Sequence, residues 1–244
     1  MNKKELIKIF KEYVSNFDML DEAIKRKYYH SLRVMDISIN IAKSLKLNKE
    51  DIYIAGIIGL LHDYGRFTQW NEYHTYNDLI SIDHGDLAVK LLFDDKEIEK
   101  YNIDRKYYGV IHDSIKYHNK LEIPSNLSKK SKLFSKIIRD ADKIDIMYIL
   151  GMDTYFLKED NYEISKDLKL EYYDNKLLSR EKIKSNNDNI LLHLSMVYDL
   201  NYNYSYKFIN ENKLIDKIFN NITQKEIFKE YFNYIIKFID ERKD

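Results

Sequence analysis

Apolar residues recur along most of the chain at intervals of three and four positions, the spacing that places them on one face of an α-helix. These stripes predict helices at about residues 2–16, 22–46, 48–63, 83–92, 104–118, 129–150, 188–200 and 222–241. The charged, Asn-rich stretch 158–189 is expected to hold at most a short helix near 172–178. Residues 67–81 and 201–206 show no clear period and are expected to be loops. The pattern therefore predicts an all-α protein.

Composition is consistent with one sizeable helical domain. The chain has 244 residues, of which 44% are hydrophobic, so it can bury a substantial core. One Pro and six Gly favour helices over a turn-rich β fold. No repeat or flexible linker marks a boundary. We expect a domain at residues 1–157, with residues 158–244 packed on it as a charged excursion and a helical cap.

Charge balance and the absence of cysteine limit which partners and which metal ligands the protein can have. Forty basic side chains balance forty acidic ones, so no global positive field favours long nucleic acid or an anionic membrane. The absence of Cys excludes disulfides and thiolate chemistry and leaves His, Asp and Glu as metal ligands. The first residues lack an apolar leader, and no apolar run reaches the roughly 20 residues that span a bilayer. We expect a cytoplasmic protein without a membrane segment.

The candidate chemistry lies where the apolar stripes end. His62 and Asp63 follow the apolar run 57–61 directly. Side chains of adjacent residues diverge by about 100° on a helix, so both reach one ion only where the helix ends or is distorted. Gly65 is expected to supply that ending.

Other polar groups share this placement. His30, His84 and His118 each occupy an apolar stripe or its end, and Asp142 lies among the apolar positions of the helix predicted at 129–150. A buried ionised carboxylate costs several kcal/mol unless it pairs or binds a metal. A single histidine of this kind is ordinary in a core, but several that converge with carboxylates favour a metal site.

The order of these residues resembles the HD-domain superfamily of metal-dependent phosphohydrolases over about residues 22–150. The resemblance implies a single HD-type helical bundle with a helical C-terminal extension. It also implies one divalent ion (Mn, Mg, Co, Ni or Fe) with ligands at His30, His62, Asp63 and Asp142. Asp142 best matches the family pattern in Ala141-Asp142-Lys143, while Asp140 and Asp145 remain alternatives.

Some members of the superfamily, including the HD-GYP and cyclic-nucleotide phosphodiesterase branches, hold a second ion with two further histidines. His84 and His118 are similar to these, and Asp63 would then bridge two ions. Asn119 stands where HD-GYP proteins have a second consecutive histidine, and their Gly-Tyr-Pro signature is missing, which argues against cyclic di-nucleotide hydrolysis. Arg66 stands where HD-GYP members often carry Lys, so it is a candidate phosphate clamp.

The expected activity is hydrolysis of a phosphate ester of a nucleotide or another small phosphorylated metabolite by metal-activated water. Asp63 and Arg66 are the candidate catalytic residues, and Arg66, His74 and Asp145 are candidate substrate contacts. A diiron oxygenase and a non-catalytic nucleotide-binding module remain alternatives, and a homo-oligomer is compatible with the sequence. His112 is expected to point about 120° away from His118.

Overall fold

The computed structural model describes residues 2–152 and 157–243, and this part of the chain contains helices and no strand. The predicted all-α fold class is thereby confirmed. The chain divides into two compact units, Met1–Ala141 and Asp142–Asp244, and helix α7 (Lys129–Met152) continues across the boundary. The domain boundary expected after residue 157 stays a prediction.

The first unit is built from helices joined by segments of different lengths. Its helices are α1 (Lys3–Val14), α2 (Glu22–Ser44), α3 (Lys49–Leu61), α4 (Tyr64–Tyr73), α5 (His84–Val89), α6 (Tyr108–Lys116) and the first part of α7. A π-helical turn at Lys90–Asp94 and 3-10 turns at Glu97–Tyr101 and Arg105–Tyr107 connect α5 to α6.

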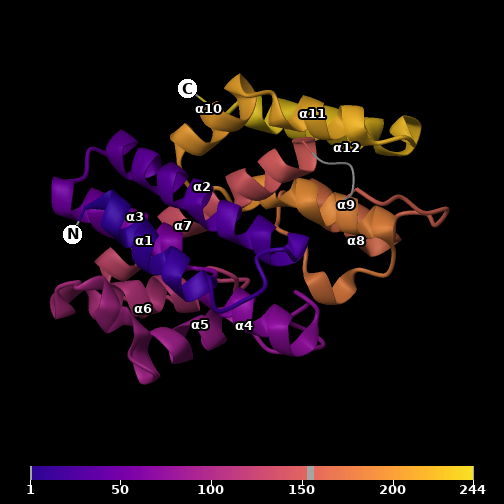
Figure 1. The fold of residues 1–244 in the computed structure, drawn as a ribbon. Helices are drawn as coiled ribbons and strands as arrows, with labels where there is room; N and C mark the ends of the chain where they lie inside the picture. The colour runs from indigo at the N-terminus through magenta and orange to yellow at the C-terminus, as the bar shows by residue number, and fades with distance from the viewer. Residues whose placement is uncertain (1, 153–156, 244) are drawn as a thin grey trace. The chain divides into compact units, whose positions relative to one another are not determined.

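Helices α2 and α3 pack side by side (Figure 1). The Asn48 side chain accepts a hydrogen bond from the backbone N–H of Asp51, so α3 begins at the predicted cap. Gly59 of α3 lies against the backbone of α2, where an added Cβ would come within 2.8 Å of the Val34 carbonyl oxygen. The missing side chain of Gly59 therefore lets the two helices approach closely.

Helix α4 occupies a stretch for which the sequence predicted a loop from residue 67, and that prediction was wrong. Tyr64 and Phe67 are fully buried against α1. The Tyr64 ring stacks on Tyr13 with centroids 3.7 Å apart, and Phe67 meets Phe10 edge-on at 5.7 Å. Packing against α1 supplies the stabilisation that this short helix's own apolar pattern does not reveal.

Gly65 does not end a helix, contrary to the sequence prediction. It is the second residue of α4, and its φ is not positive. A Cβ at this position would lie 2.6 Å from the carbonyl oxygen of His84 and 2.8 Å from the backbone nitrogen of Ala88. Gly65 is therefore required for the close approach of α5 to α4.

Among its described residues, the second unit contains the rest of α7 and the α-helices that follow it. These are α8 (Lys166–Tyr173), α9 (Asn186–Ser195), α10 (Asn203–Glu211), α11 (Leu214–Asn221) and α12 (Lys225–Asp240). The short helix expected near 172–178 lies earlier, and the loop expected at 201–206 contains the start of α10. Helix α11 was not predicted, although Leu214, Ile215 and Ile218 form its buried face.

Polar side chains of the second unit form hydrogen bonds within that unit. The Glu159 carboxylate accepts hydrogen bonds from the backbone N–H groups of Thr223 and Gln224 at the start of α12. Buried Asp188 accepts hydrogen bonds from the backbone N–H and the hydroxyl of Ser165. None of the helices in the described ranges has the length and apolarity needed to cross a membrane.

Candidate metal centre

The break between α3 and α4 turns His62 and Asp63 toward the same point. Helix α3 ends at Leu61, and Asp63 leaves helical geometry with φ −98° and ψ 20° before α4 begins. Asp63 holds the N-cap position of α4, but its carboxylate makes no capping hydrogen bond. Its Oδ2 instead lies 3.5 Å from Nε2 of His62. The distortion expected at this pair is present, at Asp63 itself.

The two oxygens of Asp63 face two different pairs of histidines. Oδ2 lies 3.4 Å from Nε2 of His30 and 3.5 Å from Nε2 of His62. Oδ1 lies 3.4 Å from Nε2 of His84 and 3.8 Å from Nε2 of His118. Each pair and its oxygen form a group whose ligand atoms lie within 4.8 Å of one another, which is compact enough to hold a metal ion.

Different helices position these four histidines, and all of them are buried. His30 lies within α2, and His84 is the first residue of α5. His62 directly follows α3, and His118 comes just after the end of α6. The structure therefore brings together, around Asp63, the histidines that the sequence placed on separate apolar stripes.

Hydrogen bonds on the far side of the rings fix which nitrogen faces the site. Nδ1 of His62 donates to the Gly59 carbonyl oxygen at 2.8 Å, and Nδ1 of His118 donates to that of Ile115 at 2.6 Å. Nδ1 of His84 donates to the Asp78 carboxylate at 2.6 Å. In neutral rings the Nε2 atoms therefore carry lone pairs.

This donor arrangement fits a metal ion. Nε2 of His84 and Nε2 of His118 are 2.9 Å apart, and those of His30 and His62 are 3.2 Å apart. For His84 and His118, whose Nδ1 atoms both donate to oxygens, two Nε2 lone pairs at this distance repel one another unless they share a cation. Metal-binding histidines characteristically donate their other N–H to a carbonyl or carboxylate oxygen, as His62, His84 and His118 do.

The protonation states also suit a metal. Burial opposes the ionisation of Asp63, but the positive charge of Lys27 and the neighbouring His62 hold the pKa of this carboxyl well below its usual value. Burial, together with the nearby Arg66 guanidinium, lowers the pKa of His84 to about 3. At neutral pH the site thus offers a carboxylate and a neutral imidazole, the forms that coordinate metals.

Arg66 is buried beside Asp63 and holds the segment that follows α4. Its Nη1 donates to the Gln69 side chain at 2.7 Å, to the Tyr76 carbonyl oxygen at 2.7 Å and to Asp78 at 2.8 Å. Its Nε lies 3.6 Å from Oδ1 of Asp63. Arg66 therefore borders the site from within the protein, and its contact with a substrate phosphate stays a prediction.

Sequence reasoning missed two residues that contact the candidate metal ligands directly. Lys27 lies 2.7 Å from Oδ2 of Asp63, and Asp78 binds His84. Lys27 precedes His30 by three residues on α2, so helical spacing could have placed both on one face. Asp78 belongs to a stretch without periodicity, and nothing in its sequence context marks it.

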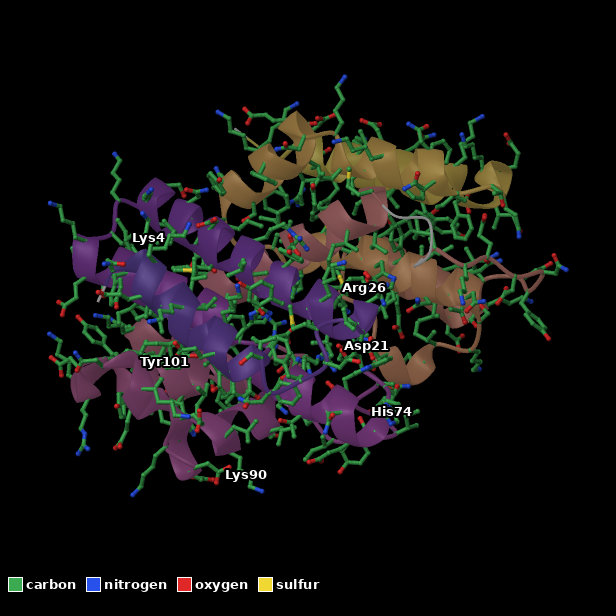
Figure 2. All side chains as sticks on the ribbon, in the orientation of Figure 1. Lys4, Asp21, Arg26, His74, Lys90 and Tyr101 are labelled. Atoms are coloured by element: carbon green, nitrogen blue, oxygen red, sulfur yellow. The ribbon has the colours of Figure 1, made fainter. Side chains whose placement is uncertain are left out.

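The remaining candidates are His74, Asp142 and Asp145. His74 is exposed at the C-terminal end of α4, where Figure 2 labels it. Asp142 is the next residue of α7 after Ala141 and thus the first of the second unit, and Asp145 follows one turn later. Their assignments as substrate contacts or ligand stay predictions.

Two further histidines lie outside both ligand groups. Nδ1 of His112 lies 3.2 Å from the Asp113 carboxylate, and its ring packs edge-on against Phe93. His193 donates from Nδ1 to the Asn189 carbonyl oxygen within α9. Neither belongs to a group with metal-binding spacing among the described residues.

Comparison with protein families agrees with this geometry. The family model of the HD domain matches residues 28–147. The chain carries an HD domain. The matched range contains His30, the His62-Asp63 pair, His84, His118 and Asp142, so the resemblance drawn from the sequence is confirmed. The same comparisons found no match among curated proteins or solved structures. In this HD domain, the His and Asp groups of the first unit are compatible with divalent metal binding.

Proposed function

We propose that this HD domain is a divalent-metal-dependent phosphohydrolase that cleaves a phosphate ester of a nucleotide or another small phosphorylated metabolite. The division of the two Asp63 oxygens between two histidine pairs carries the proposal, because this arrangement suits two ions bridged by one carboxylate. Proteins of the HD superfamily are generally hydrolases, which supports the same reaction class.

The ligands follow from the two groups. His30 and His62 with Oδ2 of Asp63 would hold one ion, and His84 and His118 with Oδ1 would hold the other. Imidazole nitrogen and carboxylate oxygen suit Mn, Fe, Co or Ni, and carboxylate oxygen also suits Mg. We assign Asp142 as a further ligand, supported by a family match that extends past it to residue 147.

Divalent ions at such a site lower the pKa of bound water toward about 7 and polarise a phosphoryl oxygen. The chain's own contribution is to fix the donors. The backbone carbonyls of Gly59 and Ile115 keep Nε2 of His62 and of His118 directed into the site. Arg66 places a permanent positive charge next to Asp63, where negative charge develops on a phosphate during its transfer. No side chain is required as a nucleophile.

The test is phosphate release from an aryl phosphate and a nucleotide panel, with protein loaded with Mn, Co, Ni, Fe or Mg. The substitution Asp63→Asn keeps the shape of the side chain but removes its charge. It should lower turnover by at least about 100-fold, because it weakens both ion sites. The matched control, His112→Asn, changes a histidine outside the ligand groups and should keep the wild-type rate. Unchanged turnover in Asp63→Asn would exclude the proposed chemistry.

Oxygen dependence separates this reaction from the alternatives raised by the sequence. Phosphate release that is equal in anaerobic and aerobic samples supports hydrolysis. A product that forms only with iron and oxygen would instead identify a diiron oxygenase. Tight nucleotide binding without turnover under any metal would identify a binding module.

A further inference from the structure

Two positively charged side chains border Asp63, and they differ in their access to solvent. Nζ of Lys27 lies 2.7 Å from Oδ2, and 22% of this side chain is exposed. Nε of Arg66 lies 3.6 Å from Oδ1, and only 10% of that side chain is exposed. Lys27 is therefore the more solvent-accessible of the two cations beside Asp63.

The contacts of Arg66 leave it little freedom. Its Nη1 donates hydrogen bonds to the Gln69 side chain, the Tyr76 carbonyl oxygen and the Asp78 carboxylate at 2.7–2.8 Å. Movement of Arg66 toward a ligand would break these charge-assisted hydrogen bonds. These bonds also hold the segment after α4 in place. Arg66 thus acts as a fixed charge beside the site.

Lys27 has the opposite character. Its ammonium pairs with Asp63 and lies 5.4 Å from the centroid of the Tyr76 ring, a contact that tolerates small displacements. A Lys side chain carries three donors on a flexible four-carbon stem and binds phosphate as a point charge. The Asp63 oxygen that Lys27 contacts is also the oxygen assigned to the His30–His62 ion.

We propose that Lys27 binds the phosphate group of the substrate. This inference rests on the proposed function, since it takes the ions at Asp63 to be the place where the phosphate is held. An ion on Oδ2 competes with the Lys27 ammonium for the same oxygen, and a phosphate oxygen next to that ion offers the ammonium a new anionic partner. When the phosphate binds, the Lys27 ammonium moves from the Asp63 carboxylate to a phosphate oxygen, and residue 27 stays part of α2.

The test measures two binding constants by calorimetry, and neither depends on turnover. The first is the affinity of the apo protein for the metal alone, and the second is the affinity of the metal-loaded protein for inorganic phosphate. Lys27→Ala and the longer Lys27→Gln should weaken phosphate binding by about 10- to 100-fold, as expected for loss of one hydrogen bond to a charged group. Their metal affinity should be equal to or tighter than that of the wild type, because a competing cation is gone.

Two further variants sharpen the result. Lys27→Arg keeps a charged donor and should retain phosphate affinity within a few fold. Lys25→Ala removes a neighbouring lysine of α2 that pairs with Glu22 at 3.1 Å on the surface, and it should behave as the wild type. Melting curves of all variants show whether each one is folded.

Several outcomes would overturn the inference. Wild-type phosphate affinity in Lys27→Gln would do so, as would a joint loss of metal and phosphate binding, which would make Lys27 a support for Asp63. Metal-loaded wild-type protein that binds no phosphate would also overturn it. Failure of the proposed function alone would look different: phosphate would bind through Lys27, but no ester would be hydrolysed.

Discussion

The Asp78 carboxylate accepts a hydrogen bond from Nδ1 of His84 at 2.6 Å, which leaves Nε2 of His84 for a metal. The other oxygen of Asp78 accepts from Arg66. Burial would raise the pKa of Asp78, but His84 and Arg66 keep it below the ordinary value. Asp78 thus fixes the orientation of His84, one histidine of the His84–His118 pair.

We expect Asp78→Ala to weaken one ion site selectively. Loss of a hydrogen bond that orients a ligand typically lowers metal affinity by about 10- to 100-fold. Calorimetric titration should therefore show one weakened and one unchanged ion. Asp86→Ala is the control, because Asp86 is an exposed residue of α5 whose carboxylate pairs with Lys120 at 2.9 Å. Equal weakening of both ions in Asp78→Ala would contradict the separation of the sites.

Single ligand substitutions should remove the two ions independently. His30→Ala should lose the ion at Oδ2 of Asp63, and His84→Ala should lose the ion at Oδ1, because each deletes one of the two imidazoles in its group. Asp63→Ala should lose both. Elemental analysis after dialysis reports the metal content, with about half the wild-type content expected for each histidine variant. A histidine variant with wild-type content would remove that residue from the ligand set.

The close approach at Gly65 predicts a stability cost for any side chain there. A Cβ would lie 2.6 Å from the His84 carbonyl oxygen, so Gly65→Ala must push α5 away from α4. We expect a loss of about 1–3 kcal/mol in the free energy of unfolding. Gly109→Ala is a matched control, because a Cβ at Gly109, near the start of α6, meets nothing within 4 Å.

Urea or thermal unfolding measures both variants. The midpoint of Gly65→Ala should fall by about 2–4 °C for each kcal/mol lost. Gly109→Ala should be neutral or gain up to about 1 kcal/mol, since Ala is the better helix former. Equal midpoints for the two variants would show that α5 does not depend on contact at Gly65.

The second unit should lose stability in mild acid through His193. Burial, with the nearby Arg180, lowers the pKa of His193 to about 4 from its ordinary 6.5. Below pH 6.5, His193 of the unfolded chain binds a proton, whereas His193 of the folded chain binds it only near pH 4. This contribution to stability is therefore full above pH 6.5 and is lost as the pH falls toward 4.

Replacing His193→Gln should remove that part of the pH dependence. The wild type should lose more stability than the variant between pH 7.5 and pH 5, by on the order of 1 kcal/mol. Thermal midpoints at several pH values measure the difference. Parallel curves for the two proteins would mean that His193 ionises equally in both states.

Sequence patterns predicted the long helices because the apolar pattern within each of these segments is long enough to recognise. Helices α2 and α7 carry apolar residues at helical spacing, and α3 is an apolar run buried from Ile54 to Leu61. The Asn48 side chain caps the start of α3. Helices α4 and α11 are short, and their stability comes from packing that period and composition do not encode. The burial of Tyr64 and Phe67 under α1 shows this at the edge of the site.

The candidate site was predictable as a set of residues but not as a geometry. Periodicity indicated that His30, His84 and His118 face the interior, and the order of residues indicated the family. It could not indicate that the oxygens of Asp63 divide between two histidine pairs, because that depends on how the helices meet. Asp78 escaped prediction because its segment is ordered by hydrogen bonds to Arg66 and Gln69 and not by apolar spacing.

Gly59 and Gly65 lie on either side of the His62-Asp63 pair, and each allows a neighbouring helix to touch backbone. These backbone contacts hold α2 and α5 next to the pair, and His30 and His84 lie on these two helices. The donor atoms are thereby preorganised, and most of the conformational entropy of assembling them is lost during folding and not on ion binding. We therefore expect the first unit to fold without metal, unlike a zinc finger, and the ions to bind to a cage that already exists.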